Sequence, residues 1–116
     1  MPLNQGIDSN FRATKVYYAR IELLGATLTG YYATDCVVAR TGVGTYTVKL
    51  PQKFKRLLGA DLTNAGSTGV VTDLNLATTG LVDLTGVTEP AGGVPKVIFV
   101  KLIVPTDDFN ARTAVG

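Results

Sequence analysis

The stretch that decides the fold is Val37–Leu50, which reads VVARTGVGTYTVKL. Its second half alternates apolar and polar residues, and such alternation puts successive side chains on opposite faces of an extended strand. The segment 41–44, TGVG, contains two glycines, which adopt the backbone conformations that a tight turn needs. We therefore predict a β-hairpin, in which a strand over Asp35–Arg40 turns into a strand over Val43–Leu50. The residues of the second strand that share its apolar face are Tyr46, Val48 and Leu50.

The same period of two recurs upstream of the hairpin, in Lys15–Leu24. Arg20 and Glu22 lie on one face of this segment, as expected for a half-buried strand. The opposite, apolar face consists of Tyr17, Ala19, Ile21 and Leu23.

The segment Lys96–Val104 differs, because both of its faces are apolar. A strand of this kind is central in its sheet or covered on both faces. The second face is covered either by the domain's own second sheet or by a neighbouring subunit. Lys101 on that face indicates a subunit boundary or the rim of the core, since lysine is almost never buried without a partner. The first face comprises Ile98, Val100, Leu102 and Val104, and the second Val97, Phe99, Lys101 and Ile103.

The middle of the chain has weaker patterns. A short helical turn is expected at Gln52–Leu58, where Pro51 precedes apolar residues at helical spacing. Three further strands are expected over Leu57–Thr63, Gly69–Leu76 and Leu81–Val87, and a loop over Glu89–Pro95.

About seven short strands at intervals of roughly 8 to 12 residues are typical of a sandwich or small barrel. We therefore predict an all-β chain with a single small antiparallel β-sandwich or barrel over residues 14–104. Residues 1–13 and 105–116 have no strand periodicity and are expected to be flexible N- and C-terminal arms. Such arms either serve no role in an isolated domain or reach a neighbour in an assembly.

Composition favours a folded domain and excludes several classes of partner. The chain has 116 residues, of which 46% are hydrophobic and 17% charged, unlike a disordered sequence. No stretch approaches the roughly 20 apolar residues that span a bilayer, so we expect no membrane contact. The net charge of +2 is too small to indicate nucleic-acid binding. The local cluster of Lys49, Lys53, Lys55 and Arg56 is a solvated face or a site for an acidic protein partner. Phosphate binding is the less favoured alternative, because the stretch lacks the interleaved aromatic residues of a stacking platform.

The chain offers little for catalysis. It contains no histidine, which is the commonest general base, and its single cysteine, Cys36, lacks a histidine to activate it. A pair drawn from Asp61, Asp73 and Asp83 could in principle act as in a glycosidase, but aspartates beside Thr, Asn and Gly are usually turn formers. We predict no catalytic residues, no metal and no cofactor.

Tyrosine pairs point to interfaces. Adjacent residues of a strand face opposite ways, so one tyrosine of Tyr17-Tyr18 and one of Tyr31-Tyr32 should face away from the core. Exposed tyrosines favour protein contacts, although both rings could equally pack on the two faces of a sandwich strand or on its rim. The candidate interface residues are Tyr17, Tyr18, Tyr31, Tyr32, Lys53, Lys55, Arg56, Phe109 and Arg112.

The hairpin sequence Val37–Leu50 resembles the R-T-G-x-G-x-Y-T-V-x-L hairpin of small structural proteins of tailed phages, including head decoration (cement) proteins and fibre-associated domains. The resemblance covers about fifteen residues. It implies a β-rich virion protein on the capsid exterior, present in many copies, whose partners are the major capsid protein and other copies of itself in a dimer or trimer. No catalytic residue belongs to that role.

We therefore predict a non-enzymatic capsid decoration protein, whose β-core docks on the shell while its arms extend over neighbouring capsid subunits. An alternative is a tail- or fibre-associated adhesion domain that binds a host glycan or protein through a tyrosine-lined groove. A small hydrolase is a third class, and it requires a carboxylate with a shifted pKa in a cleft.

Overall fold

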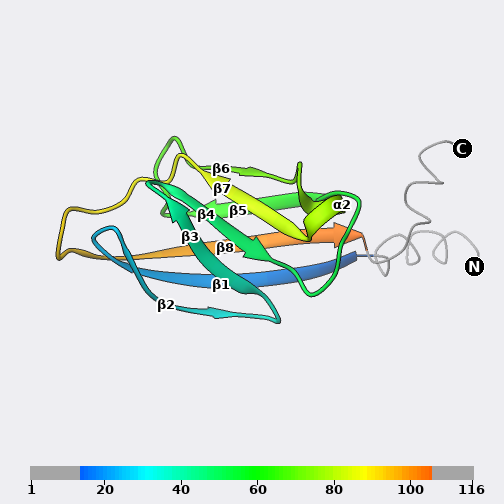
Figure 1. Ribbon diagram of the computed structural model, residues 1–116, viewed down its shortest axis with the longest axis horizontal. Coiled ribbons are helices and arrows are strands. Elements are labelled where there is room, and N and C mark those ends of the chain that lie inside the picture. Colours follow the sequence, from blue (N-terminus) through cyan, green and yellow to red (C-terminus); the bar gives the residue numbers. More distant parts are fainter. Residues whose placement is uncertain (1–13, 106–116) are drawn as a thin grey trace, which may run out of the picture.

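The computed structural model describes residues 14–105, which form two four-stranded antiparallel sheets packed as a sandwich (Figure 1). The all-β prediction is confirmed, and of the two predicted architectures, sandwich or barrel, the structure has the sandwich. Apart from Pro105, the predicted arms lie outside the described residues. In chain order the elements are β1 Thr14–Leu24, β2 Thr27–Ala33, β3 Val37–Gly42, β4 Thr45–Lys49, β5 Gly59–Thr63, β6 Val70–Thr72, α2 Leu76–Thr79, β7 Leu81–Thr85 and β8 Pro95–Pro105.

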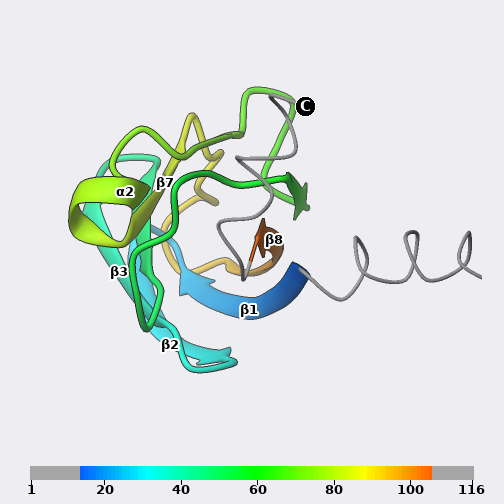
Figure 2. The ribbon, with the colours of Figure 1, turned by 90° about the vertical axis from the view of Figure 1, so that its right-hand side faces the viewer.

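The first sheet has the strand order β2-β1-β8-β5, and the second has the order β3-β4-β7-β6. β1 and β8 pair along their full length, from Thr14 opposite Pro105 to Leu24 opposite Pro95. β8 is therefore a central strand, as its two apolar faces predicted. It also extends to Pro105, one residue beyond the predicted core. Figure 2 views the sandwich from the end at which β1 begins and β8 ends.

The core lies between the two sheets, and the period of two determines which residues fill it. On β1, β4 and β8 the alternate apolar positions identified in the sequence are all buried, and Val82 and Leu84 of β7 face them from the second sheet. The second sheet therefore covers only the first apolar face of β8. The second face, with Phe99 and Lys101, is the outer face of the sandwich. The buried core residues of these four strands are Tyr17, Ala19, Ile21, Leu23, Tyr46, Val48, Val82, Leu84, Ile98, Val100, Leu102 and Val104.

The predicted hairpin is confirmed as β3 and β4, which pair antiparallel with an irregularity between Arg40 and Gly42. Gly44 has a φ of +67° in the turn, a left-handed conformation that side chains other than glycine rarely adopt. Its carbonyl accepts a hydrogen bond from the Val87 backbone N–H at 3.0 Å, which ties the turn to the segment after β7.

The predicted helical turn at Gln52–Leu58 is wrong, because this segment is irregular. A single helical turn is costly to nucleate, and here the backbone finds partners elsewhere. The Leu57 N–H donates to Asp73 Oδ2 at 2.7 Å, and the Leu58 N–H donates to the Ile103 carbonyl at 2.7 Å. Phe54 is nevertheless buried, with its ring centroid 6.1 Å from that of Tyr17.

The helix that does form is α2. It begins at Leu76, the last residue of the strand predicted over Gly69–Leu76, and continues to Thr79. Only Val70–Thr72 of that region is β-strand, and Leu76 begins the helix with its side chain fully buried. The edge strand β2 was not predicted as a separate strand. Its burial does not alternate cleanly, because it lies at a sheet edge and its register shifts between Glu22 and Leu23 of β1.

Candidate protein-binding face

The outer face of the first sheet carries two cross-strand rows of side chains. The first row runs Tyr32, Arg20, Phe99 and Thr63 across β2, β1, β8 and β5, and the second runs Tyr18, Lys101 and Asp61 across β1, β8 and β5. Antiparallel register aligns these residues, because each lies directly opposite its neighbour on the next strand. The aromatic face is defined by these seven residues: Tyr18, Arg20, Tyr32, Asp61, Thr63, Phe99 and Lys101.

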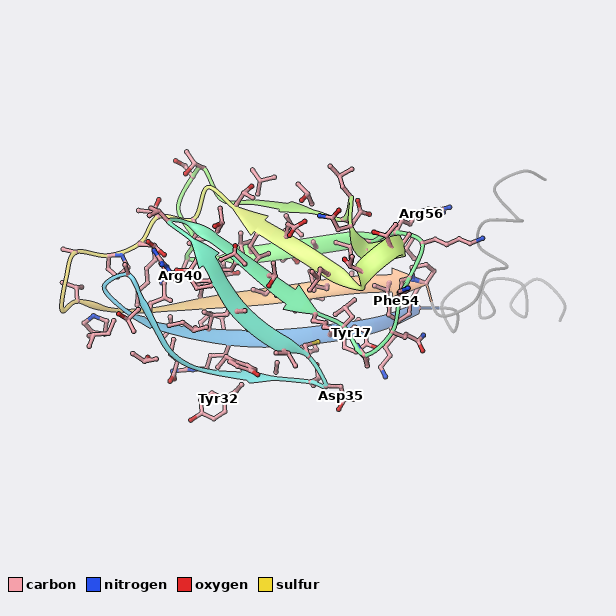
Figure 3. The ribbon with its side chains drawn as sticks, viewed as in Figure 1. Tyr17, Tyr32, Asp35, Arg40, Phe54 and Arg56 are labelled. Carbon is pink, nitrogen blue, oxygen red and sulfur yellow. The ribbon has the colours of Figure 1, made fainter. Side chains whose placement is uncertain are left out.

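Three aromatic side chains are exposed together on this face. Tyr18 is 55% exposed, Tyr32 68% and Phe99 47%. Figure 3 labels Tyr32, whose ring extends from β2 away from the sandwich. A single exposed apolar residue is ordinary on a protein surface, but neighbouring exposed aromatics are typical of a binding surface.

A hollow of about 320 Å³ lies between the two rows. Its floor is formed by Ala19 and Val100, which point inward at the register position between the rows. All seven residues of the aromatic face line it. The hollow is therefore a shallow depression over the two central strands.

Arg20 is held in place at the centre of the face. Its Nε donates to Glu22 Oε2 at 3.1 Å, and its guanidinium lies 5.6 Å from the centroid of the Phe99 ring. The first contact is an exposed ion pair and contributes little to stability. The second is a cation–π contact, which keeps the guanidinium over the aromatic ring.

Two charges on the aromatic face have no partner within the described part of the chain. Asp61 and Lys101 lie opposite each other on β5 and β8, yet neither side chain makes a hydrogen bond or ion pair among residues 14–105. Their charged groups are thus available to a binding partner.

The outer face of the second sheet is different. Its corresponding row runs Ala39, Thr47, Asp83 and Thr72 across β3, β4, β7 and β6. These side chains are small or polar and include no aromatic residue. The aromatic character is therefore confined to one of these two outer faces.

The structure places the predicted tyrosines as follows. The prediction of Tyr17 as an interface residue is wrong, because its side chain points into the core and is 3% exposed. Tyr18 faces outward. Tyr32 shares the outer face with Arg20, whereas Tyr31 lies opposite the core residue Ile21. Tyr31 is still 37% exposed because β2 is an edge strand.

The basic residues Lys53, Lys55 and Arg56 are exposed, but the fold does not bring them to the aromatic face. They lie in the irregular segment after β4, and Figure 3 shows Arg56 at the end of the sandwich where β1 begins and β8 ends. Phe109 and Arg112 lie outside the described residues.

The interface residues predicted from the sequence do not include Arg20, Asp61, Thr63 or Phe99, whereas Lys101 was expected at a subunit boundary or at the rim of the core. The signal that was present is the second apolar face of Lys96–Val104, which contains Phe99 and Lys101. The register that places Arg20 beside Phe99 and Asp61 beside Lys101 joins segments far apart in the chain, and periodicity does not specify it.

Comparison with known proteins gave no match. No family model, no curated protein and no solved structure is significantly similar to this chain.

The three aspartates considered for catalysis do not form one cluster, although Asp73 directly follows Thr72, the residue opposite Asp83 on β7. Asp61 is on the outer face of the first sheet and Asp83 on that of the second, so the core separates them. Asp73 accepts a hydrogen bond from the Leu57 N–H, and Asp83 accepts one from Asn75 Nδ2. Within residues 14–105 no group of three or more His, Cys, Asp or Glu side chains could hold a metal ion, and no helix there is long and apolar enough to cross a membrane.

One carboxylate has a strongly shifted pKa, but it is engaged in a structural cluster. Glu89 accepts two hydrogen bonds from Arg40, with Nε at 2.8 Å and Nη2 at 3.0 Å, and a third from the Tyr46 hydroxyl. Its side chain is only 9% exposed. The Arg40 guanidinium, assisted by Tyr46 and the Gly44 backbone N–H, lowers the pKa of Glu89 to about 2. The cluster joins the β3–β4 hairpin to the loop before β8.

We expect Glu89→Gln to lower the free energy of unfolding by about 1–2 kcal/mol at neutral pH, because it weakens charge-assisted hydrogen bonds. The folded-state pKa lies below the ordinary value of 4.5, so the carboxylate's contribution is complete above that value and is lost as the pH falls toward 2. The gap between wild type and variant should therefore narrow on acidification. Urea unfolding from neutral pH down to about pH 2.5 measures it.

The matched control is Glu22→Gln, which removes the exposed ion pair with Arg20 and should change stability by less than about 0.5 kcal/mol. If the difference in the free energy of unfolding between wild type and Glu89→Gln stayed constant as the pH was lowered, the predicted dependence of stability on the ionisation of Glu89 would be contradicted.

Proposed function

We propose that this chain is a non-enzymatic structural protein that binds other protein surfaces, and that it serves as a capsid decoration protein on the exterior of a tailed-phage virion. The observation that carries the proposal is the aromatic face, where three exposed aromatic side chains and two unpaired charges cover the centre of a sheet. Tyrosine, phenylalanine and arginine are typical of the centres of protein interfaces.

The hairpin supports the virion part of the proposal. The segment that resembles the phage hairpin forms β3, the Gly44 turn and β4. Its tyrosine, Tyr46, is buried and its hydroxyl donates to Glu89, so this residue of the motif has a structural role. A structural role for the motif agrees with a protein that works by assembly.

The position of the chain ends supports contact with a shell. Thr14 and Pro105 lie opposite each other, so residues 1–13 and 106–116 are attached to adjacent strands at one end of the sandwich. The exposed Arg56 is near this end (Figure 3), and the exposed Lys53 and Lys55 belong to the same short segment. An acidic capsid surface would complement them.

In this mechanism the chain binds only the assembled shell and stabilises it by mass action. Many weak contacts, multiplied over the copies on one particle, give a large total effect. The aromatic face and the end that carries the arms are separate surfaces, and one molecule can therefore engage two neighbours at once.

The test is the copy number of this chain in purified virions of the phage that encodes it, measured by quantitative mass spectrometry against the major capsid protein. A ratio close to one-to-one is the expected result for a protein that covers the shell. A few copies per particle would assign it to the tail or a fibre, and absence from the particle would refute a virion role.

The arms are tested separately by deleting residues 1–13 and 106–116 from the full chain. We expect the deletion to weaken binding to capsids that lack the protein, while far-ultraviolet circular dichroism of the β-core stays unchanged. Binding of the truncated chain at the wild-type level would refute the role of the arms.

A tail- or fibre-associated adhesion domain is the second candidate, and the hollow lined by Tyr18 and Tyr32 favours it. A sugar ring would stack on an aromatic side chain there, although the Arg20 guanidinium already covers one face of the Phe99 ring. A glycan array probed with the full chain tests this function. A hit that is lost in Tyr32→Ala would support it, and an array without hits counts against glycan binding.

A further inference from the structure

We propose that the aromatic face binds the same face of a second copy of this chain, in a dimer with a two-fold axis that runs across the strands between the two rows. The inference rests on the proposed function only in that both take the aromatic face to be a protein-binding surface. It names the partner of that surface, and that partner can be tested without a capsid.

The carrying observation is the pattern at the centre of the face. On β1 the first row has the cation Arg20 and the second row the aromatic Tyr18. On β8 the order is reversed, with the aromatic Phe99 in the first row and the cation Lys101 in the second. Cations and aromatics therefore alternate in both directions over the two central strands.

This alternation makes the face complementary to itself. A two-fold axis along the rows sets the first row of one copy against the second row of the other. Each strand then lies against the same strand of the second copy, β1 against β1 and β8 against β8. Arg20 then lies against the second copy's Tyr18, and Phe99 lies against the second copy's Lys101. Each of these is a cation–π pair, which gains strength when the interface excludes water.

The neighbouring strand β5 fits the same axis. Asp61 has no partner in the described chain, and on β5 it lies one row away from Thr63. The axis brings Asp61 of each copy against Thr63 of the other, where the hydroxyl can donate to the carboxylate. An axis parallel to the strands would also match cations with aromatics, but it would set Asp61 against Thr34 just after β2, whose hydroxyl already donates to the Tyr18 carbonyl.

The backbone geometry suits this arrangement. Two sheets that pack face to face lie about 10 Å apart with their strands nearly aligned, as the two sheets of the sandwich already do. The proposed dimer adds a third such interface between two first sheets. It is isologous, so every contact occurs twice and the assembly closes at two copies.

The experiment is sedimentation velocity of the purified full chain over a range of concentrations, for wild type and for single variants. We expect wild type to form a dimer. Phe99→Ala and Lys101→Glu should each raise the dissociation constant about tenfold or more, since each removes a contact that occurs twice. Both side chains are on the surface, so circular dichroism and the unfolding midpoint should change little.

The matched control is Val37→Ala, which removes an apolar side chain that is 56% exposed on the second sheet. It should leave the dissociation constant unchanged. A wild-type chain that remains monomeric at millimolar concentration would overturn the proposal, as would a trimer or a dimer that neither Phe99→Ala nor Lys101→Glu weakens.

The axis is tested by cross-linking with a short bismaleimide. A mixture of Thr63→Cys and Asp61→Cys chains should cross-link in high yield, because these positions face each other across the proposed axis. A higher yield from Thr63→Cys with Tyr32→Cys would overturn the axis. The native Cys36 should not compete, since it is buried and its pKa is raised to about 11, mainly by burial.

The two proposals fail in different ways. A chain that dimerises as described but is absent from virions keeps the dimer and loses the capsid function. A chain that covers the capsid but is monomeric in solution, and whose capsid binding survives Phe99→Ala, keeps the capsid function and loses the dimer.

Discussion

Leu102→Ala is expected to lower the free energy of unfolding by about 3 kcal/mol, whereas Ile103→Ala on the same strand should cost less than about 1 kcal/mol. Leu102 is 1% exposed and points between the sheets, and its loss removes buried methyl groups and leaves a cavity. Ile103 is half-buried on the outer face, where water can fill the space. Because successive residues of β8 face opposite sides of the sheet, the same truncation should cost more stability at Leu102 than at its neighbour Ile103.

Urea unfolding at a low protein concentration measures the stability of both variants. The slope of the free energy of unfolding against urea concentration should be the same as in wild type. The low concentration keeps the chain monomeric, so that association does not add to the stability. Equal losses at Leu102 and Ile103 would mean that the outer face of β8 is as well covered as the inner face, and the two-layer arrangement would be contradicted.

Gly86→Ala is expected to destabilise the fold by about 3 kcal/mol or more. Gly86 has a φ of +67°, and a Cβ there would overlap the backbone carbonyl oxygen of Thr68. The backbone of Thr68 would have to move, and the hydrogen bond from its hydroxyl to the Gly86 carbonyl, 2.6 Å long, would be lost. Conformational strain and steric overlap therefore act together at this site.

Two other glycines separate these causes. Gly93 has a φ of +79°, but a Cβ added there would have no atom within 4 Å, so Gly93→Ala should cost only the conformational strain, about 1 kcal/mol. Gly92 has neither constraint, and Gly92→Ala should change stability by less than about 0.5 kcal/mol. Thermal and urea unfolding of the three variants give the comparison. If Gly86→Ala lowered the free energy of unfolding no more than Gly93→Ala, the backbone of Thr68 would be able to move away at no energetic cost, and the predicted steric contribution would be wrong.

The sandwich could be predicted from sequence where one strand face is buried and the other is not. The alternation in Lys15–Leu24 and Val43–Leu50 predicted the buried residues of β1 and β4 correctly, because a strand with one core face shows its burial in its own pattern. The glycines of the 41–44 turn likewise identified the hairpin. The irregular segment Gln52–Leu58 was mispredicted, since its backbone partners Asp73 and Ile103 are distant in the chain.

The candidate site could be predicted only in part. Sequence indicated that one tyrosine of each pair faces out and that the second face of β8 was unusual, and Tyr18, Tyr32 and Phe99 are exposed accordingly. It also assigned Tyr17 to an interface, although the alternation of this strand had placed Tyr17 on the apolar face with Ala19 and Ile21, so its burial was already indicated. The role in a virion stays a prediction.

The sequence by itself determined the all-β class, the hairpin and the core residues of the long strands, because these depend on side-chain alternation and turn chemistry within short segments. Only the tertiary structure decided that β1 lies between β2 and β8 and that β5 pairs with β8. That pairing sets Arg20 beside Phe99 and Lys101 beside Asp61. The physical reason is that register between distant strands results from packing the whole core, and a slip of one residue would turn the aromatic face inward.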